Sequence, residues 1–361
     1  MGRSHAPGWT RARVGRRWGA MGELDEWDYL LPEGCIARVP ALERSGSRLM
    51  HLPLSGGEPT DHAFGEVLSF LRLGDLLVGN DTRVMSARLR ATRATGGALE
   101  ILLLEPGPGV VQALLKPARR LREGERVNLV GGGTVVVHGR AKDEGVFRIE
   151  FDADPIQVMA SQGEIPLPPY LERQATSEDA ERYQTVYAGP LGAAAAPTAG
   201  LHFSTELFAR LKERGIGFET LTLHVGIGTF RPVKAEDLAV GRLHEERYSI
   251  SPALVEAIRR TREKGGRVVA IGTTTVRALE SATPNGDRIP VSGASTTNIL
   301  IRPPYSLRAV DGLITNFHLP RSSLLMLVGA MVGRERLLST YRSAVERGYR
   351  FYSYGDAMLL I

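Results

Sequence analysis

Several segments of the chain place threonine and glycine where an apolar run ends. In the first, the apolar residues 268–271 lead into Gly272, Thr273 and Thr274, and a helix pattern follows. Backbone N–H groups at the start of a helix have no partner within the helix, so this segment suits an anionic or polar ligand group. Helix capping is the alternative, although a cap needs one threonine and the segment has three.

Three histidines lie at similar junctions. His202 directly precedes a predicted helix, whose dipole disfavours imidazolium and so favours a neutral ring that can act as a base or a hydrogen-bond donor. His224 ends an apolar strand pattern. His318 follows Asn316 by two residues, so the two side chains point the same way from a strand and suggest the mouth of a pocket. A lone histidine at a strand end is more often structural than catalytic, but two at adjacent junctions favour a site.

Other chemistries find little support. The histidines His202, His224, His244 and His318 could gather around a metal, but their spacing fits no ligand pattern, and the sequence predicts no metal site. A single cysteine, Cys35, excludes a disulfide scaffold, a zinc ribbon and an iron–sulfur protein. The sequence also lacks the motifs of P-loop NTPases, dinucleotide-binding Rossmann enzymes, α/β-hydrolases and zincins.

Polar and basic residues surround an apolar strand at residues 75–78. Asn80 and Asp81 follow it, and an Asx-type turn explains both without a function. Several nearby arginines could face phosphate groups. They are Arg38, Arg44, Arg48, Arg83 and Arg88.

Composition and charge limit the class of protein. The chain has 361 residues, of which 43% are hydrophobic, as in soluble globular proteins, and its length suggests two domains. Residues 1–20 hold five arginines and no acid, whereas the rest has 40 basic and 40 acidic residues, so net charge carries no argument for nucleic-acid binding. We predict that residues 1–20 are a disordered extension, although an RNA-binding tail or an upstream start before Met21 would fit as well. No apolar run approaches the roughly 20 residues of a membrane span, so we expect no membrane protein, and the single cysteine favours the cytoplasm.

The elements that must position these residues change in type along the chain. Residues 71–153 contain strand patterns separated by glycine-rich turns, and residues 146–151 alternate as in a half-buried strand. This region predicts a small closed β-barrel or a sandwich. After about residue 155, helices alternate with strands: Ser204 and Ser251 are expected helix caps, residues 312–316 a strand, and Phe351 the centre of the last strand.

A series of motifs runs in one order over residues 25–361. They include residues 80–84, 165–170, 182–187, 196–203, 222–226, 228–233, 272–281, 313–320 and 353–358. Together they resemble the S-adenosylmethionine:tRNA ribosyltransferase-isomerases of queuosine biosynthesis. Gly79 stands where that family usually has an aromatic residue, and Asn298 where an Asp is usual, which leaves the role of Asn298 open.

The resemblance implies a larger α/β barrel-like domain, residues 21–70 and 154–361, interrupted by an inserted all-β barrel at residues 71–153. It also implies a reaction. The ribosyl group of S-adenosylmethionine is transferred to 7-aminomethyl-7-deazaguanine at the tRNA wobble position and isomerised, giving epoxyqueuosine and releasing adenine and methionine.

The resemblance and the segments above together give candidate roles. We expect His202 or His224 to remove the ribosyl proton and His318, or another of the three, to protonate the departing adenine, with base and acid unassigned. The expected substrate-binding residues are Thr198, Gly200, Gly226, Thr229, Thr273, Thr274, Arg277 and Asn316. The expected tRNA-binding residues are Arg38, Arg48, Asn80, Asp81, Arg83, Arg88 and Arg231.

The expected partners are S-adenosylmethionine, consumed as a co-substrate, and a tRNA with a GUN-type anticodon, without a metal or other cofactor. We also expect a monomer with no membrane association. A methyltransferase and a non-catalytic RNA-binding module are the rival functions. Analysis of the products separates all three.

Overall fold

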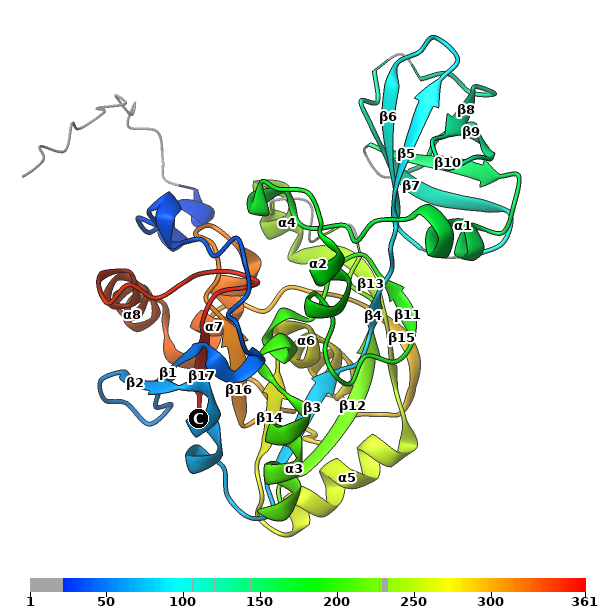
Figure 1. Cartoon of the computed structure of the whole chain (residues 1–361). Helices are drawn as coiled ribbons and strands as arrows, with labels where there is room; N and C mark the ends of the chain where they lie inside the picture. The colour runs from blue at the N-terminus through cyan, green and yellow to red at the C-terminus, as the bar shows by residue number, and fades with distance from the viewer. Residues whose placement is uncertain (1–21, 106, 120, 143–144, 227, 229–232) are drawn as a thin grey trace, which may run out of the picture.

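The computed structural model is described for residues 22–361 except 106, 120, 143–144, 227 and 229–232. The predicted site residues Thr229 and Arg231, and the extension at residues 1–20, lie outside the described residues. The described chain forms a mixed α/β body built on one large sheet, and a smaller closed β-barrel that stands beside it (Figure 1).

Nine strands of the described chain form the large sheet. Three middle strands run parallel to each other and are buried on both faces, which explains their apolar sequences. The strands, from one edge to the other, are β15 (Gly293–Ile299), β13 (Arg242–Ile250), β12 (Gly217–Leu223), β3 (Leu76–Asn80), β14 (Val268–Ile271), β16 (Gly312–Asn316), β17 (Ala357–Leu360), β1 (Arg48–Leu52) and β2 (Thr60–Ala63).

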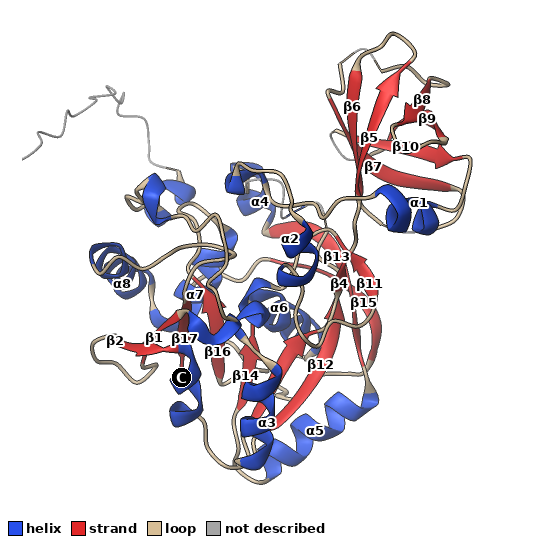
Figure 2. Cartoon of the chain, viewed as in Figure 1, coloured by secondary structure: helices blue, strands red, loops and turns tan. Residues whose placement is uncertain are grey.

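Helices cover both faces of this sheet, as Figure 2 shows. Successive residues of β14 face opposite cores: Val268 and Ala270 pack with α5 to α8, while Val269 and Ile271 pack with α3. The predicted caps are confirmed, since Ser204 and Ser251 each accept a backbone N–H at the start of a helix. The main helices are α3 (Thr205–Glu213), α5 (Pro252–Glu263), α6 (Thr273–Ala282), α7 (Ser323–Val332) and α8 (Arg334–Glu346).

Short elements complete the described chain. Six of them are 3-10 helices, labelled η, and the strands β4 and β11 pair with each other. Their bounds are η1 (Glu23–Trp27), η2 (Glu33–Cys35), η3 (Arg44–Gly46), η4 (Phe64–Phe70), η5 (Pro169–Leu171), η6 (Thr198–His202), α1 (Pro155–Gln162), α2 (Ser177–Arg182), α4 (Ala235–Val240), β4 (Arg83–Val84) and β11 (Leu191–Ala193).

Six described strands close the barrel, and all pair antiparallel. The alternation predicted for residues 146–151 is confirmed, because Phe147, Ile149 and Phe151 are buried in the barrel core. In order around the barrel, the strands are β10 (Val146–Phe151), β7 (Val110–Lys116), β6 (Ala98–Leu103), β5 (Arg88–Arg93), β8 (Arg126–Leu129) and β9 (Thr134–Arg140).

Two local predictions were wrong. The apolar strand at residues 75–78 was grouped with the barrel strands, but it belongs to β3 in the middle of the large sheet, where a strand buried on both faces must be apolar throughout. The last strand is β17, whereas Phe351 makes only an isolated bridge to Ile36. The Pro-rich segment at residues 164–170 packs into the interior, where Ile165 and Leu167 are buried.

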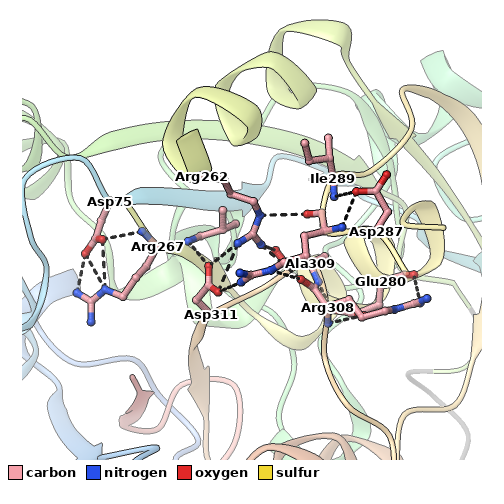
Figure 3. Close-up of polar contacts among 11 residues, drawn as sticks. Asp75, Arg262, Arg267, Glu280, Asp287, Ile289, Arg308, Ala309 and Asp311 are labelled. Atoms are coloured by element: carbon pink, nitrogen blue, oxygen red, sulfur yellow. Dashed lines mark hydrogen bonds and ion pairs between the residues drawn. The ribbon is translucent and has the colours of Figure 1, made fainter. Parts of the chain in front are cut away.

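Ion pairs hold the amino ends of the parallel strands (Figure 3). The buried Asp75, just before β3, pairs with Arg267, just before β14, at 2.6 Å. Asp311, just before β16, accepts the backbone N–H of Val268 at 2.8 Å and pairs with Arg262 at 3.1 Å. These contacts fix the parallel strands at one end and leave the loops at their carboxyl ends to build a site, as is usual for parallel sheets.

Candidate functional site

A cavity of about 420 Å³ lies at the carboxyl ends of the parallel strands. Its wall includes the loop after β14, the loop after β16, η6 and part of β13. Among the predicted site residues, six line this cavity: Thr198, Thr273, Thr274, Arg277, Asn316 and His318.

The start of α6 faces this cavity. Gly272, in the N-cap position, has a φ of 92°, which a glycine adopts at little cost. No side chain caps this helix, so the threonines do not act as caps. Thr275 instead donates to the carbonyl of Ile271 at 2.8 Å, and Thr274 accepts from Asn80 at 3.3 Å. The backbone N–H groups at the start of α6 are therefore open to a ligand.

Arg277 lies one turn further along α6 and forms an ion pair with Glu246 of β13. Both side chains line the cavity, and they are only 8% and 5% exposed. Glu246 also accepts a long hydrogen bond of 3.4 Å from the backbone of Gly226. The pairing of β13 with the sheet therefore brings Glu246 and Arg277 together, and their spacing in the sequence does not.

A chain of hydrogen bonds runs from the cavity wall into the protein. Thr198 donates to Asn316 Oδ1 at 2.9 Å, and Asn316 Nδ2 donates to His202 Nε2 at 3.0 Å. Because His202 Nε2 accepts, its proton is on Nδ1, which donates to Ser47 Oγ at 2.7 Å. Burial lowers the pKa of His202 to about 4, so the ring is neutral at pH 7.

His318 lies in the cavity wall, held on two sides. Its Nε2 pairs with Thr315 Oγ1 at 2.9 Å, and its backbone N–H donates to the Tyr341 hydroxyl at 3.1 Å. Burial lowers its pKa to about 3. His318 is therefore a neutral hydrogen-bonding group, since a ring with this pKa is a weak proton acceptor at pH 7.

Other predicted site residues lie outside the cavity wall. His224 Nδ1 pairs with Thr82 at 2.8 Å, and burial, with a further effect of Arg247, lowers the pKa of this half-buried ring. Gly200 serves packing, because a Cβ there would lie 2.2 Å from the Tyr187 hydroxyl. The backbone N–H of Gly226 donates a hydrogen bond to Glu246.

Asn80, the last residue of β3, and Asp81 make hydrogen bonds to residues of the neighbouring strand β12. Asn80 Oδ1 accepts from the backbone of Thr82 at 3.2 Å, which confirms the Asx-type turn. Asp81 accepts hydrogen bonds from Thr220 and Thr222 at 2.9 and 2.7 Å. Both residues therefore have structural partners.

The predicted tRNA-binding arginines within the described chain also have intramolecular partners. Arg38 pairs with Glu33 and Glu172, and Arg83 donates to the carbonyls of Ala188 and Gly189. Arg48 lies over the ring of Tyr349 at 3.9 Å, and Arg88 donates to the carbonyl of Leu167 at 3.0 Å.

Sequence reasoning assigned no substrate role to several residues of the cavity wall. His244 was considered only as a possible metal ligand and Glu246 was given no role, although their alternate spacing on a strand puts both side chains on one face. Tyr170, Tyr183 and Tyr352 also line the cavity. Their only signal was that they fall within or next to the segments of the family resemblance.

Metal and membrane features were searched among the residues that the structure describes. No group of three or more His, Cys, Asp or Glu side chains there could hold a metal ion, so the four histidines do not gather. In the same residues, no helix has the length and apolar character needed to cross a membrane.

Comparison with known proteins adds to this geometry. A family model described as "Queuosine biosynthesis protein" matches residues 24–360. The chain therefore belongs to this family. Curated relatives named "S-adenosylmethionine:tRNA ribosyltransferase-isomerase" include one from Gloeobacter violaceus, 52% identical over 93% of this chain and 95% of that protein. Another, from Anaeromyxobacter dehalogenans strain 2CP-C, is 47% identical over 94% of this chain and 99% of its own length.

A solved structure of this family supports the fold. It is the crystal structure of an S-adenosylmethionine tRNA ribosyltransferase from Thermotoga maritima, 34% identical, with a TM-score of 0.53. The match covers 93% of this chain and all of that one. The predictions of the queuosine biosynthesis family and of a mixed α/β fold with a closed β-barrel are confirmed.

Proposed function

We propose that the chain is an S-adenosylmethionine:tRNA ribosyltransferase-isomerase. It transfers and isomerises the ribosyl group of S-adenosylmethionine onto 7-aminomethyl-7-deazaguanine at the tRNA wobble position, forming epoxyqueuosine and releasing adenine and methionine. The observation that carries this proposal is the match to relatives of that name over nearly the whole chain. The cavity at the strand ends provides a site of suitable polarity.

The cavity residues would mainly position S-adenosylmethionine, because its sulfonium already acidifies the adjacent carbon and provides a leaving group. Thr198 and Asn316 would hold the sugar, and the start of α6 would hold another polar group. His202 does not line the cavity, so it would act through Asn316 as a positioning residue. His224 does not line the cavity either; its ring pairs with Thr82 and is packed against Gly192.

Proton transfer then needs a different group. His244 and His318 are histidines of the cavity wall, and His318 has a pKa of about 3. His244 has no hydrogen-bond partner among the described residues, so its ring is free to meet substrate. We therefore favour His244 as the base, with His318 as a neutral donor or acceptor near the adenine. His244→Gln should lower kcat far more than it raises KM for S-adenosylmethionine.

The remaining features of the proposal follow from the family. The tRNA would carry a GUN-type anticodon, S-adenosylmethionine would be consumed as a co-substrate, and no other cofactor would take part. A monomer acting in the cytoplasm fits this substrate. The tRNA-binding roles of Arg38, Arg48, Arg83 and Arg88 would add to their structural contacts. Arg231, which lies outside the described residues, would share this role.

Product analysis tests the proposal. The protein is incubated with S-adenosylmethionine and tRNA that carries 7-aminomethyl-7-deazaguanine, and the small molecules and digested nucleosides are analysed by mass. Adenine, methionine and an epoxyqueuosine nucleoside are expected. The same tRNA with unmodified guanine is the control. S-adenosylhomocysteine with a methylated nucleoside would make the protein a methyltransferase, and binding without turnover would leave an RNA-binding role.

A further inference from the structure

The ion pair between Arg277 and Glu246 has unused hydrogen-bonding capacity. Arg277 Nη1 contacts Glu246, and Nε donates a long bond of 3.4 Å to the carbonyl of Ile299. Its Nη2 is buried and has no partner among the described residues. Leaving a buried donor unpaired is costly, so a ligand that accepts from this guanidinium would remove an energetic penalty.

A second group for an anion lies beside this guanidinium. Thr273 and Thr274 begin α6 one turn before Arg277, and they line the same cavity. The uncapped N–H groups there carry a partial positive charge. Glu246, on the facing strand β13, offers a negative charge to the same cavity. The wall therefore presents an anion-binding and a cation-binding group side by side.

An α-amino acid carries this pair of charges in reverse. We propose that this part of the cavity binds the methionine end of S-adenosylmethionine, an inference that rests on the proposed function. Arg277 and the N–H groups of α6 bind the carboxylate, and Glu246 binds the α-ammonium group. The isolated ion pair adds little stability by itself, because desolvation offsets the attraction of its charges, so substrate recognition explains it better.

Decarboxylated S-adenosylmethionine separates the two contacts, because it keeps the ammonium group and lacks the carboxylate. Affinities for both ligands are measured by calorimetry with the full-length protein. The wild type should bind S-adenosylmethionine ~10- to 100-fold more tightly, as expected for charge-assisted hydrogen bonds. Arg277→Gln should reduce that ratio to the smaller value that the N–H groups of α6 alone supply, by weakening S-adenosylmethionine more than the decarboxylated ligand, whereas Glu246→Gln should weaken both ligands alike. Arg260→Gln, on the exposed surface of α5, is the matched control.

The wild-type ratio tests the inference even if a variant fails to fold. Equal affinity of the wild type for the two ligands would overturn this inference and leave the proposed function standing. An undiminished ratio in folded Arg277→Gln would also overturn it. If the wild type binds neither ligand, the proposed function fails as well.

A second inference rests on the distribution of charge. Residues 88–151, which hold all the barrel strands, contain 11 Lys and Arg against 7 Asp and Glu. Residues 21–87 and 152–361 together contain 29 basic and 33 acidic residues. The overall balance of the chain therefore conceals a basic barrel on an acidic body.

Exposed cations gather at one end of the barrel. The antiparallel register puts the end of β7, the start of β8 and the end of β9 together, at the end where β5 finishes. The chain enters the barrel from the large sheet at the start of β5, so this end points away from the body (Figure 1). Its exposed cations, which form no ion pair with a described residue, are Lys116, Arg119, Arg122, Arg126, Arg140 and Lys142.

The structure assigns this basic end of the barrel to the phosphate backbone of the tRNA. Unpaired cations release counterions when they meet phosphates, so they add affinity without sequence preference. The described arginines predicted earlier already have intramolecular partners, whereas these six side chains form no ion pair with a described residue. The wobble base would enter the cavity while the stem meets the barrel.

The salt dependence of tRNA binding tests this surface. Replacing Arg119, Arg122 and Arg126 by Gln should raise the Kd for tRNA at least ~10-fold and reduce the slope of log Kd against log salt by about 2 to 3. The Kd for S-adenosylmethionine should not change. Replacing Arg259, Arg260 and Lys264 of the α5 region by Gln is the control for total charge. An unchanged slope, or an equal loss in the control, would overturn the assignment, whereas a wild type that binds no tRNA would reject the proposed function itself.

Discussion

The hydrogen-bond chain behind the cavity makes a prediction about Asn316→Asp. In the wild type, Asn316 Nδ2 donates to His202 Nε2 at 3.0 Å, so the Nε2 atom of His202 carries no proton. A carboxylate has the same shape but can only accept, so His202 must place a proton on Nε2. The charge of the carboxylate then stabilises imidazolium beside it, and the pKa of His202 should rise.

The size of the change follows from the burial of His202. Burial holds its pKa at about 4, with opposing smaller effects from Asp356 and Arg350. A buried carboxylate within hydrogen-bond distance raises such a pKa by roughly 1 to 3, so we expect a pKa of about 6 for His202 in Asn316→Asp.

This shift changes the dependence of stability on pH. The pKa of His202 is lower in the folded protein than the value of about 6.5 in the unfolded chain. The contribution of His202 to the free energy of unfolding is therefore complete above pH ~6.5 and is lost as the pH falls toward 4. At pH 5 this loss is about 2 kcal/mol for the wild type and under about 1 kcal/mol for Asn316→Asp. Protonation of His318 lowers the free energy of unfolding by the same amount in both proteins, so this effect cancels in the comparison.

Two measurements check this reasoning. NMR titration of the histidine ring protons gives the pKa of His202, and urea unfolding at pH 7.5 and pH 5 gives the two stability differences. Asn128→Asp, at an exposed position of β8, adds the same charge away from the site and is the control. If the pKa of His202 stays near 4 in Asn316→Asp, and the acid loss equals that of the wild type, the hydrogen-bond chain is not as described.

Two further predictions concern stability. Gly200→Ala should lower the free energy of unfolding by about 1–3 kcal/mol in urea titrations, because its Cβ would clash with the Tyr187 hydroxyl. Adding Tyr187→Phe should relieve part of this loss. Equal stability of Gly200→Ala and the wild type would argue against the packing role. Arg267→Met leaves the carboxylate of Asp75, only 1% exposed, without its cation. The free energy of unfolding should fall by roughly 3 kcal/mol, which a lower melting temperature would show. Adding Asp75→Asn should recover part of that loss, and a melting temperature that does not respond to Arg267→Met would contradict the account.

Much of the fold could be predicted because it depends on local patterns. The caps at Ser204 and Ser251 are set by side chains that reach N–H groups three residues away, so sequence neighbours suffice. The alternation of Phe147, Ile149 and Phe151 likewise reflects the period of a strand with one buried face. The strand at residues 75–78 was placed in the wrong sheet because a short apolar run has no periodicity that names its neighbours.

The sequence by itself determined which segments end in groups able to bind a ligand, and its motifs determined the family. It placed Thr273, Asn316 and His318 at the ends of strands, where a parallel sheet builds its sites. Only the tertiary structure decided which of these side chains share a cavity, because contact depends on strand order and on burial. That order brings Glu246 to Arg277 across a separation of 31 residues and turns His202 away from the cavity, behind Asn316.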